Sequence, residues 1–182
     1  MAYNIVVIAG SLRKDSFSLK IANALAKLAP ASLKLEVVTP AGISFFNQDL
    51  EGAPPADWLA FREKLQKSDG VIFVTPEYNR AIPGVLKNAI DVASRPYGHN
   101  VFDGKPAGIV STSIGAVGGF GSNHHLRQSL TFLNMSQMAQ PEMYVGNSAQ
   151  VVGEDGEVAS DATKDYLAGF GAAFAAWIHK TA

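Results

Sequence analysis

Hydroxyl and guanidinium side chains are concentrated in the segment that follows the first apolar run of the chain, residues 5–9. A helix is expected to begin near Phe17, and eight consecutive residues around its start hold Ser11, Arg13, Ser16 and Ser18. A helix N-terminus carries unpaired N–H groups and a partial positive charge, so it favours anions, phosphates in particular. These residue types could hold a phosphate, although Ser16 could equally be an ordinary helix cap.

The segment matches neither of the two common phosphate-binding fingerprints. It lacks the Gly-x-Gly-x-x-Gly of dinucleotide-binding domains, and no Gly-Lys-Ser/Thr follows as in the P-loop. A cradle for the phosphate of a mononucleotide is the functional interpretation that remains, with flavin mononucleotide (FMN) as the first candidate.

Composition narrows the class of protein. The chain has 182 residues, of which 47% are hydrophobic and 17% charged, with a formal net charge of −1. This size predicts one domain over residues 1–182, and the charge does not favour nucleic acid or an anionic membrane as partner. Cysteine is absent, which excludes thiolate metal ligands, and no metal site is expected. No leader segment is visible and residues 170–178 are too short to span a bilayer, so a cytoplasmic protein is expected.

Apolar runs and helical patterns alternate along the whole chain. Such alternation predicts a doubly wound α/β fold, in which helices cover both faces of a parallel sheet. Residues 146–161 are polar and are expected to form a surface loop. Strands are expected at residues 5–9, 33–38, 71–74, 107–110 and 143–145. Helices are expected at 17–28, 58–65, 83–94 and from 163, and residues 126–135 are expected to form the core of another helix.

Ligands of open α/β sheets bind beyond the carboxyl ends of the strands, which selects the segments 10–16, 75–82 and 111–121 as one converging site. The second segment contains Pro76, Glu77, Tyr78 and Asn79. Its backbone N–H groups could bind the polar edge of a ring, or it could be a structural turn with Glu77 in solvent. The third segment contains Thr112, Ser113 and Gly115; its four glycines would allow close approach of a flat ligand, and a flexible loop explains them equally well.

Three motifs together resemble the NADPH-dependent FMN reductase family, most closely its branch of chromate, quinone, azo-dye and ferric reductases. They are Gly-Ser-Leu-Arg-Lys-Asp-Ser-Phe at 10–17, Pro-Glu-Tyr-Asn at 76–79 and Pro-Gly-Val-Leu-Lys-Asn-Ala-Ile-Asp at 83–91. His-Leu-Arg-Gln at 125–128 also fits this branch. The resemblance extends over roughly residues 3–145.

The resemblance implies a flavodoxin-like fold with five parallel strands in the order 2-1-3-4-5 and a non-covalently held FMN. It implies that NADH or NADPH transfers a hydride to FMN, and that the reduced FMN then reduces quinones, chromate, ferric complexes or azo compounds. The kinetic mechanism implied is ping-pong. The flavin carries the chemistry, so no catalytic side chain is assigned, and homodimers are implied, with tetramers as an alternative. Carried over by residue, the phosphate would be held by Ser11, Arg13, Ser16, Phe17 and Ser18, and the ring by Pro76, Glu77, Tyr78, Asn79, Thr112, Ser113 and Gly115.

Three positions depart from the family pattern: Asp15, Ser18 and Arg80. Asp15 would place a negative charge near the phosphate unless it faces solvent, and Arg80 could attract an anionic acceptor. Arg80, Arg95 and His124 are further candidates for contact with NAD(P)H or a partner subunit. Two other functions are weighed beside the enzyme: a flavodoxin-type electron carrier, which is usually more acidic, and a supplier of free reduced FMN to an oxygenase.

Overall fold

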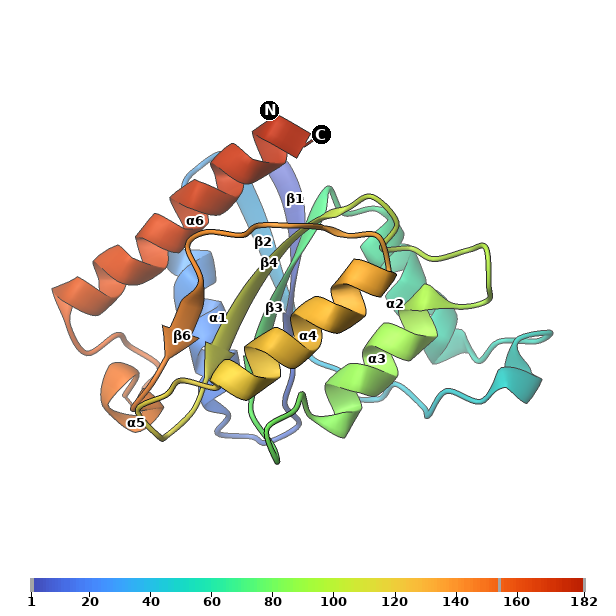
Figure 1. Ribbon diagram of the computed structural model, residues 1–182, viewed down its shortest axis with the longest axis horizontal. Helices are drawn as coiled ribbons and strands as arrows, with labels where there is room; N and C mark the ends of the chain where they lie inside the picture. The colour runs from blue at the N-terminus through green and yellow to red at the C-terminus, as the bar shows by residue number, and fades with distance from the viewer. Residues whose placement is uncertain (1, 154, 182) are drawn as a thin grey trace.

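The central sheet consists of apolar strands that are buried on both faces, the pattern that helices on both sides of a parallel sheet require. The computed structural model describes residues 2–153 and 155–181 (Figure 1). Its three inner strands are buried along almost their whole length, and the edge strand β2 is only partly buried. The bounds are β1 (Tyr3–Ala9), β2 (Leu33–Val38), β3 (Gly70–Pro76) and β4 (Pro106–Thr112).

The strand order is β2-β1-β3-β4-β5, and every pairing is parallel, which confirms the predicted 2-1-3-4-5 topology. The fifth position corrects the prediction in one respect, because two short strands share it. Both β5 (Ser136–Gln137) and β6 (Met143–Val145) pair with β4, at successive places along it. Only residues 143–145 were expected, since a strand of two residues is too short to show a hydrophobic pattern.

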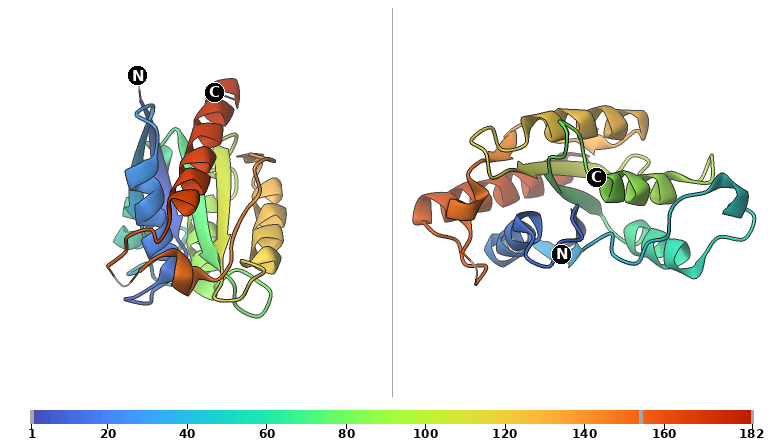
Figure 2. Two further views of the ribbon diagram at one scale, coloured as in Figure 1. Left: turned by 90° about the vertical axis from the view of Figure 1, so that its left-hand side faces the viewer. Right: turned by 90° about the horizontal axis from the view of Figure 1, so that it is seen from below.

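Helices form a layer on each face of the sheet (Figure 2). On one face, α1 and α6 pack against the sheet, and Phe170 and Phe174 of α6 are fully buried there. On the other face, α2, α3 and α4 cover the second half of the core. The bounds are α1 (Phe17–Leu28), α2 (Ala56–Gln66), α3 (Gly84–Ser94), α4 (Phe120–Phe132) and α6 (Asp161–Thr181), with a short 3-10 helix at Gln48–Leu50.

Two segments differ from the sequence predictions. The helix with its core expected at 126–135 covers Phe120–Phe132 as α4: its first turns are polar and lack apolar periodicity, and it ends three residues earlier. The expected surface loop 146–161 contains the helical turn α5 (Ser148–Val151). Backbone hydrogen bonds from Asn147 N to Gly115 O and from Ser148 N to Ser113 O hold this turn against the glycine-rich segment.

The segments that leave β1, β3 and β4 meet at one edge of the sheet, the lower edge in Figure 1. Strands β3 and β4 each run two residues further than expected, to Pro76 and Thr112, and so carry these residues to that edge. Within the described ranges, no helix combines the length and apolar character needed to cross a membrane.

Candidate functional site

A cavity of about 210 Å³ lies at this edge of the sheet. All three predicted segments contribute to it, and ten of the twelve predicted cofactor residues line it. Asn79 and Gly115 lie in the same segments without lining the cavity, while Ile114 and Ser148 line it and were not predicted. The full lining is Ser11, Arg13, Ser16, Phe17, Ser18, Pro76, Glu77, Tyr78, Thr112, Ser113, Ile114 and Ser148.

The first turn of α1 forms the end of the cavity suited to an anion. Ser16 is the N-cap, and its Oγ accepts a hydrogen bond from Leu19 N at 3.3 Å. Ser16 is therefore a helix cap and also lines the cavity, so both readings of this residue apply. The remaining N–H groups of the turn have no acceptor within the helix, and the helix dipole adds positive potential there.

One charged side chain beside this turn, that of Arg13, favours an anion as well. Arg13 lines the cavity and is exposed. Its backbone N–H donates a hydrogen bond to Ser11 Oγ at 3.2 Å. Asp15 is exposed and lines a separate groove together with Lys14 and Lys20. The carboxylate of Asp15 is therefore outside the lining of the cavity.

Two hydroxyl groups of the cavity lining have unused hydrogen-bonding capacity. Thr112 Oγ1 and Ser148 Oγ are buried and have no hydrogen-bond partner among the described residues. Buried polar groups in native proteins are nearly always paired, and an unpaired one is costly. Because both residues line the same cavity, a polar ligand is the partner that this pair of hydroxyls calls for.

A two-residue hairpin follows β3, and its first residue, Tyr78, forms another part of the cavity wall. Tyr78 and Ala81 exchange backbone hydrogen bonds of 3.0 Å in both directions. The two residues between them, Asn79 and Arg80, have φ of 52° and 62°, the geometry of a type I′ turn. The Tyr78 side chain lies at the cavity and is half exposed, so an aromatic surface is available to a planar ligand.

Both carboxylate oxygens of Glu77 have protein partners. Oε2 accepts a hydrogen bond from Ser122 N at 3.0 Å, and Oε1 lies 3.1 Å from Arg80 Nη1. Glu77 thus lines the cavity with its carboxylate already engaged, in contrast to the interpretation that leaves it in solvent.

Arg95 and His124 lie outside the cavity lining. Arg95 pairs with Glu51, with 2.6 Å between Nε and Oε1, and this contact lowers the pKa of the Glu51 carboxyl. His124 Nε2 lies 3.1 Å from the hydroxyl of Tyr144, whose pKa burial raises to about 12. Contact of Arg80, Arg95 or His124 with NAD(P)H or a partner subunit stays a prediction.

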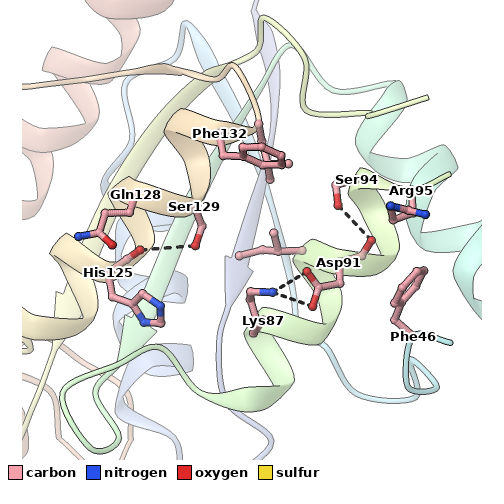
Figure 3. A pocket seen from close by; sticks show the side chains of 11 residues that line it. Phe46, Lys87, Asp91, Ser94, Arg95, His125, Gln128, Ser129 and Phe132 are labelled. Atoms are coloured by element: carbon pink, nitrogen blue, oxygen red, sulfur yellow. Dashed lines mark hydrogen bonds and ion pairs between the residues drawn. The ribbon is translucent and has the colours of Figure 1, made fainter. Parts of the chain in front are cut away.

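A second, larger depression of about 620 Å³ lies between α3 and α4 (Figure 3). Lys87 pairs with Asp91 there, and Phe132 at the end of α4 is 86% exposed. This α3–α4 groove shares no lining residue with the cavity at the carboxyl edge of the sheet, where ligands of such sheets bind. Among residues 2–153 and 155–181, no group of three or more His, Asp or Glu side chains could hold a metal ion.

The cavity fits FMN by the chemistry of its donors. The α1 N-terminus and Arg13 suit a phosphate, Tyr78 suits a ring, and the hydroxyls of Thr112 and Ser148 lack partners. A volume of about 210 Å³ is below the roughly 300–1,000 Å³ of most ligand pockets, so a bound mononucleotide would stay partly exposed. Fold and cavity together define a flavodoxin-like, mononucleotide-binding class of protein.

Comparison with known proteins gives the family. The chain belongs to the NADPH-dependent FMN reductase family, whose sequence model matches residues 3–150. It is 50% identical over 177 residues to a quinone reductase of Pseudomonas putida, covering 97% of this chain and 95% of that protein. A 2-hydroxy-1,4-benzoquinone reductase of Burkholderia sp. is 43% identical over 178 residues, which cover 98% of this chain and 97% of that protein.

Solved structures agree with this assignment. The flavoenzyme FerB of Paracoccus denitrificans, an NAD(P)H:(acceptor) oxidoreductase, superposes with a TM-score of 0.92 at 38% identity, covering 99% of each chain. The predicted flavodoxin-like fold and the predicted family are both confirmed.

Proposed function

We propose that this protein is an NAD(P)H:acceptor oxidoreductase that binds FMN in the cavity at the carboxyl edge of the sheet. When bound, FMN accepts a hydride from the pyridine nucleotide and passes electrons on to a second substrate. The observation that carries the proposal is the cavity itself, whose lining combines a helix N-terminus, two hydroxyl groups without partners among the described residues and the half-exposed Tyr78.

The residues of this chain would bind and orient the cofactor. Ser11, Arg13, Ser16, Phe17 and Ser18 surround the anion end and would hold the phosphate. Tyr78 and the hairpin backbone would lie along the ring, and Thr112 and Ser148 would hydrogen-bond its polar groups. Because the cavity is small relative to FMN, one part of the ring would stay open to donor and acceptor in turn.

Quinones are the first acceptors to test, since relatives at 50% and 43% identity are quinone reductases by name. Chromate, ferric complexes and azo compounds are proposed acceptors for the same open face. A cytoplasmic location stays a prediction from the sequence.

Steady-state kinetics with purified protein and bound FMN test the activity. NADH and NADPH are each varied at several concentrations of 1,4-benzoquinone, and parallel double-reciprocal lines are expected from two substrates that use one face in turn. No quinone-dependent oxidation of either nucleotide would contradict the proposal. A rate that requires added free FMN would favour the supply of reduced flavin to a partner instead.

A homodimer is proposed through the α3–α4 groove. The groove contains the exposed Phe132 ring and carries charges of both signs, from Lys87, Asp91 and Arg95 (Figure 3). An interface around a two-fold axis must be complementary to itself, and a surface with paired opposite charges around an apolar ring meets that condition.

Sedimentation velocity tests the dimer. Phe132→Ser is expected to give monomers, whereas Tyr97→Ser is expected to leave the dimer intact. Tyr97 is the matched control, because it is 87% exposed and lies outside the groove. A monomeric wild type, or a dimer that survives Phe132→Ser, would contradict this interface.

A further inference from the structure

The hairpin that walls the cavity is joined to helix α4 at both of its ends. At the first end, Glu77 Oε2 accepts a hydrogen bond from Ser122 N at 3.0 Å. At the second end, Ile82 N donates to His125 Nδ1 at 3.3 Å. These two hydrogen bonds, named here the α4 clamp, connect residues more than forty positions apart in the sequence.

Helix α4 needs the first of these bonds because its own cap has no side chain. The N-cap residue is Gly119, in the left-handed region at φ 77°, and no side chain caps the helix from that position. Glu77 supplies a carboxylate from another segment to Ser122, the third residue of the helix. A negative charge at a helix N-terminus is favourable for both the free N–H groups and the dipole.

Gly121 is the second indication that the hairpin and α4 are built to touch. A Cβ at this position would lie 2.9 Å from Glu77 Oε2 and 2.9 Å from Arg80 O. Any side chain here would therefore push the hairpin away from the helix. The absence of a side chain at Gly121 allows the close approach that the Glu77 hydrogen bond requires.

The second bond fixes the protonation pattern of His125. Its Nδ1 is the acceptor of the Ile82 N–H, so in this arrangement the ring proton is on Nε2. His125 also lines the α3–α4 groove, where the charged groups are Lys87 and Asp91 of α3 and Arg95 at its end. The same side chain thus contacts the hairpin on one side and the groove on the other.

We propose that Glu77 and His125 are positioning residues, and that the α4 clamp holds the hairpin wall of the cavity in place. This inference rests on the proposed function, since the wall is proposed to lie against FMN. Tyr78, which lines the cavity, lies between the two anchored residues Glu77 and Ile82. Loss of either hydrogen bond would therefore allow Tyr78 to move. The first bond of the clamp also caps the polar first turn of α4, which precedes the apolar core expected at 126–135.

Hydrogen–deuterium exchange of the protein with bound FMN tests the clamp, because exchange reports local opening of the backbone. His125→Leu removes the acceptor, and exchange in residues 78–82 is expected to speed up about tenfold or more. His125→Asn restores an acceptor near the place of Nδ1, and exchange within about threefold of wild type is expected. His124→Leu is the matched control: this neighbour contacts Tyr144, and wild-type exchange in residues 78–82 is expected.

For the Glu77 variant, exchange is measured in α4 as well as in the hairpin. Glu77 also lines the cavity, so a change in the hairpin alone could come from altered contact with the ligand. Glu77→Ala is expected to speed exchange at residues 121–123 as well as in the hairpin, and it carries the test if His125→Leu does not fold. The proposal is overturned if neither variant speeds exchange of the hairpin, if His125→Asn behaves like His125→Leu, or if His124→Leu loosens the hairpin equally. These readouts do not depend on turnover, so a failure of the proposed activity would be seen separately, in the kinetics with quinone.

Discussion

The side-chain oxygens of Ser16 and Ser18 lie 2.7 Å apart, both buried, at the first turn of α1 beside the cavity. Ser16 also accepts the N–H of Leu19. Residues 16–18 thus cap the N-terminus of α1 and also contribute two hydroxyl groups to the cavity lining. The stability of α1 and the affinity for an anion are consequently linked at Ser16.

The first prediction separates these two roles of Ser16. Ser16→Ala is expected to lower the free energy of unfolding of the FMN-free protein by about 1 kcal/mol, the usual cost of a lost cap. Ser18→Ala leaves the cap in place and is expected to cost less. Urea unfolding followed by circular dichroism measures both, and equal stability of Ser16→Ala and wild type would contradict the cap.

Arg13 is expected to contribute to retention of FMN. Arg13→Ala removes the positive charge that lines the cavity and should weaken FMN binding, so that less flavin stays with the protein through gel filtration. Lys14→Ala is the control, since Lys14 carries the same charge and lines another groove. If Arg13→Ala keeps as much FMN as wild type, the assignment of the phosphate end is wrong.

Thr112→Val is expected to change binding and stability in opposite directions. The substitution preserves the shape of the side chain and removes a buried hydroxyl without a partner. The stability of the FMN-free protein should be unchanged or higher by up to about 1 kcal/mol, because an unsatisfied polar group is costly. FMN affinity should fall, as titration of the FMN-free protein by flavin fluorescence would measure. Unchanged affinity would argue against a hydrogen bond from Thr112 to the ligand.

The ion pair of Arg95 with Glu51 predicts a pH dependence. The hydrogen bond from Arg95 lowers the pKa of Glu51 below its usual 4.5, so folding favours the carboxylate. The stabilisation is complete above the pKa of the unfolded chain and is lost as the pH falls through the lower pKa of the folded protein. In Arg95→Ala the Glu51 pKa should rise toward 4.5, which carboxyl carbon NMR can follow. A Glu51 pKa that does not move would show that the pair is absent in solution.

The fold could be predicted from the sequence because its signals are local. Continuous apolar runs marked the inner strands, and their parallel arrangement followed from the alternation with helices, whereas the order 2-1-3-4-5 came from the family resemblance. The cavity segments were found by the same logic, since a carboxyl-edge rule needs only the strand ends. Ile114 lay within the predicted third segment and could have been included.

The parts that escaped prediction depend on contacts between distant segments. Ser148 reaches the cavity only because α5 hydrogen-bonds to the glycine-rich segment at Ser113, and nothing local marks it. The start of α4 is set by Gly119 together with Glu77, which is more than forty residues away. A pattern read along one stretch of chain cannot detect a cap that comes from another.

The most direct test of the central claim is a visible absorption spectrum of the purified protein, recorded without oxygen before and after adding NADH or NADPH. The account predicts a flavin spectrum that bleaches with at least one nucleotide and returns when a quinone is added. Bound flavin that does not bleach would indicate an electron carrier in place of the proposed oxidoreductase. A colourless protein that also fails to take up added FMN would contradict the assignment of the cavity.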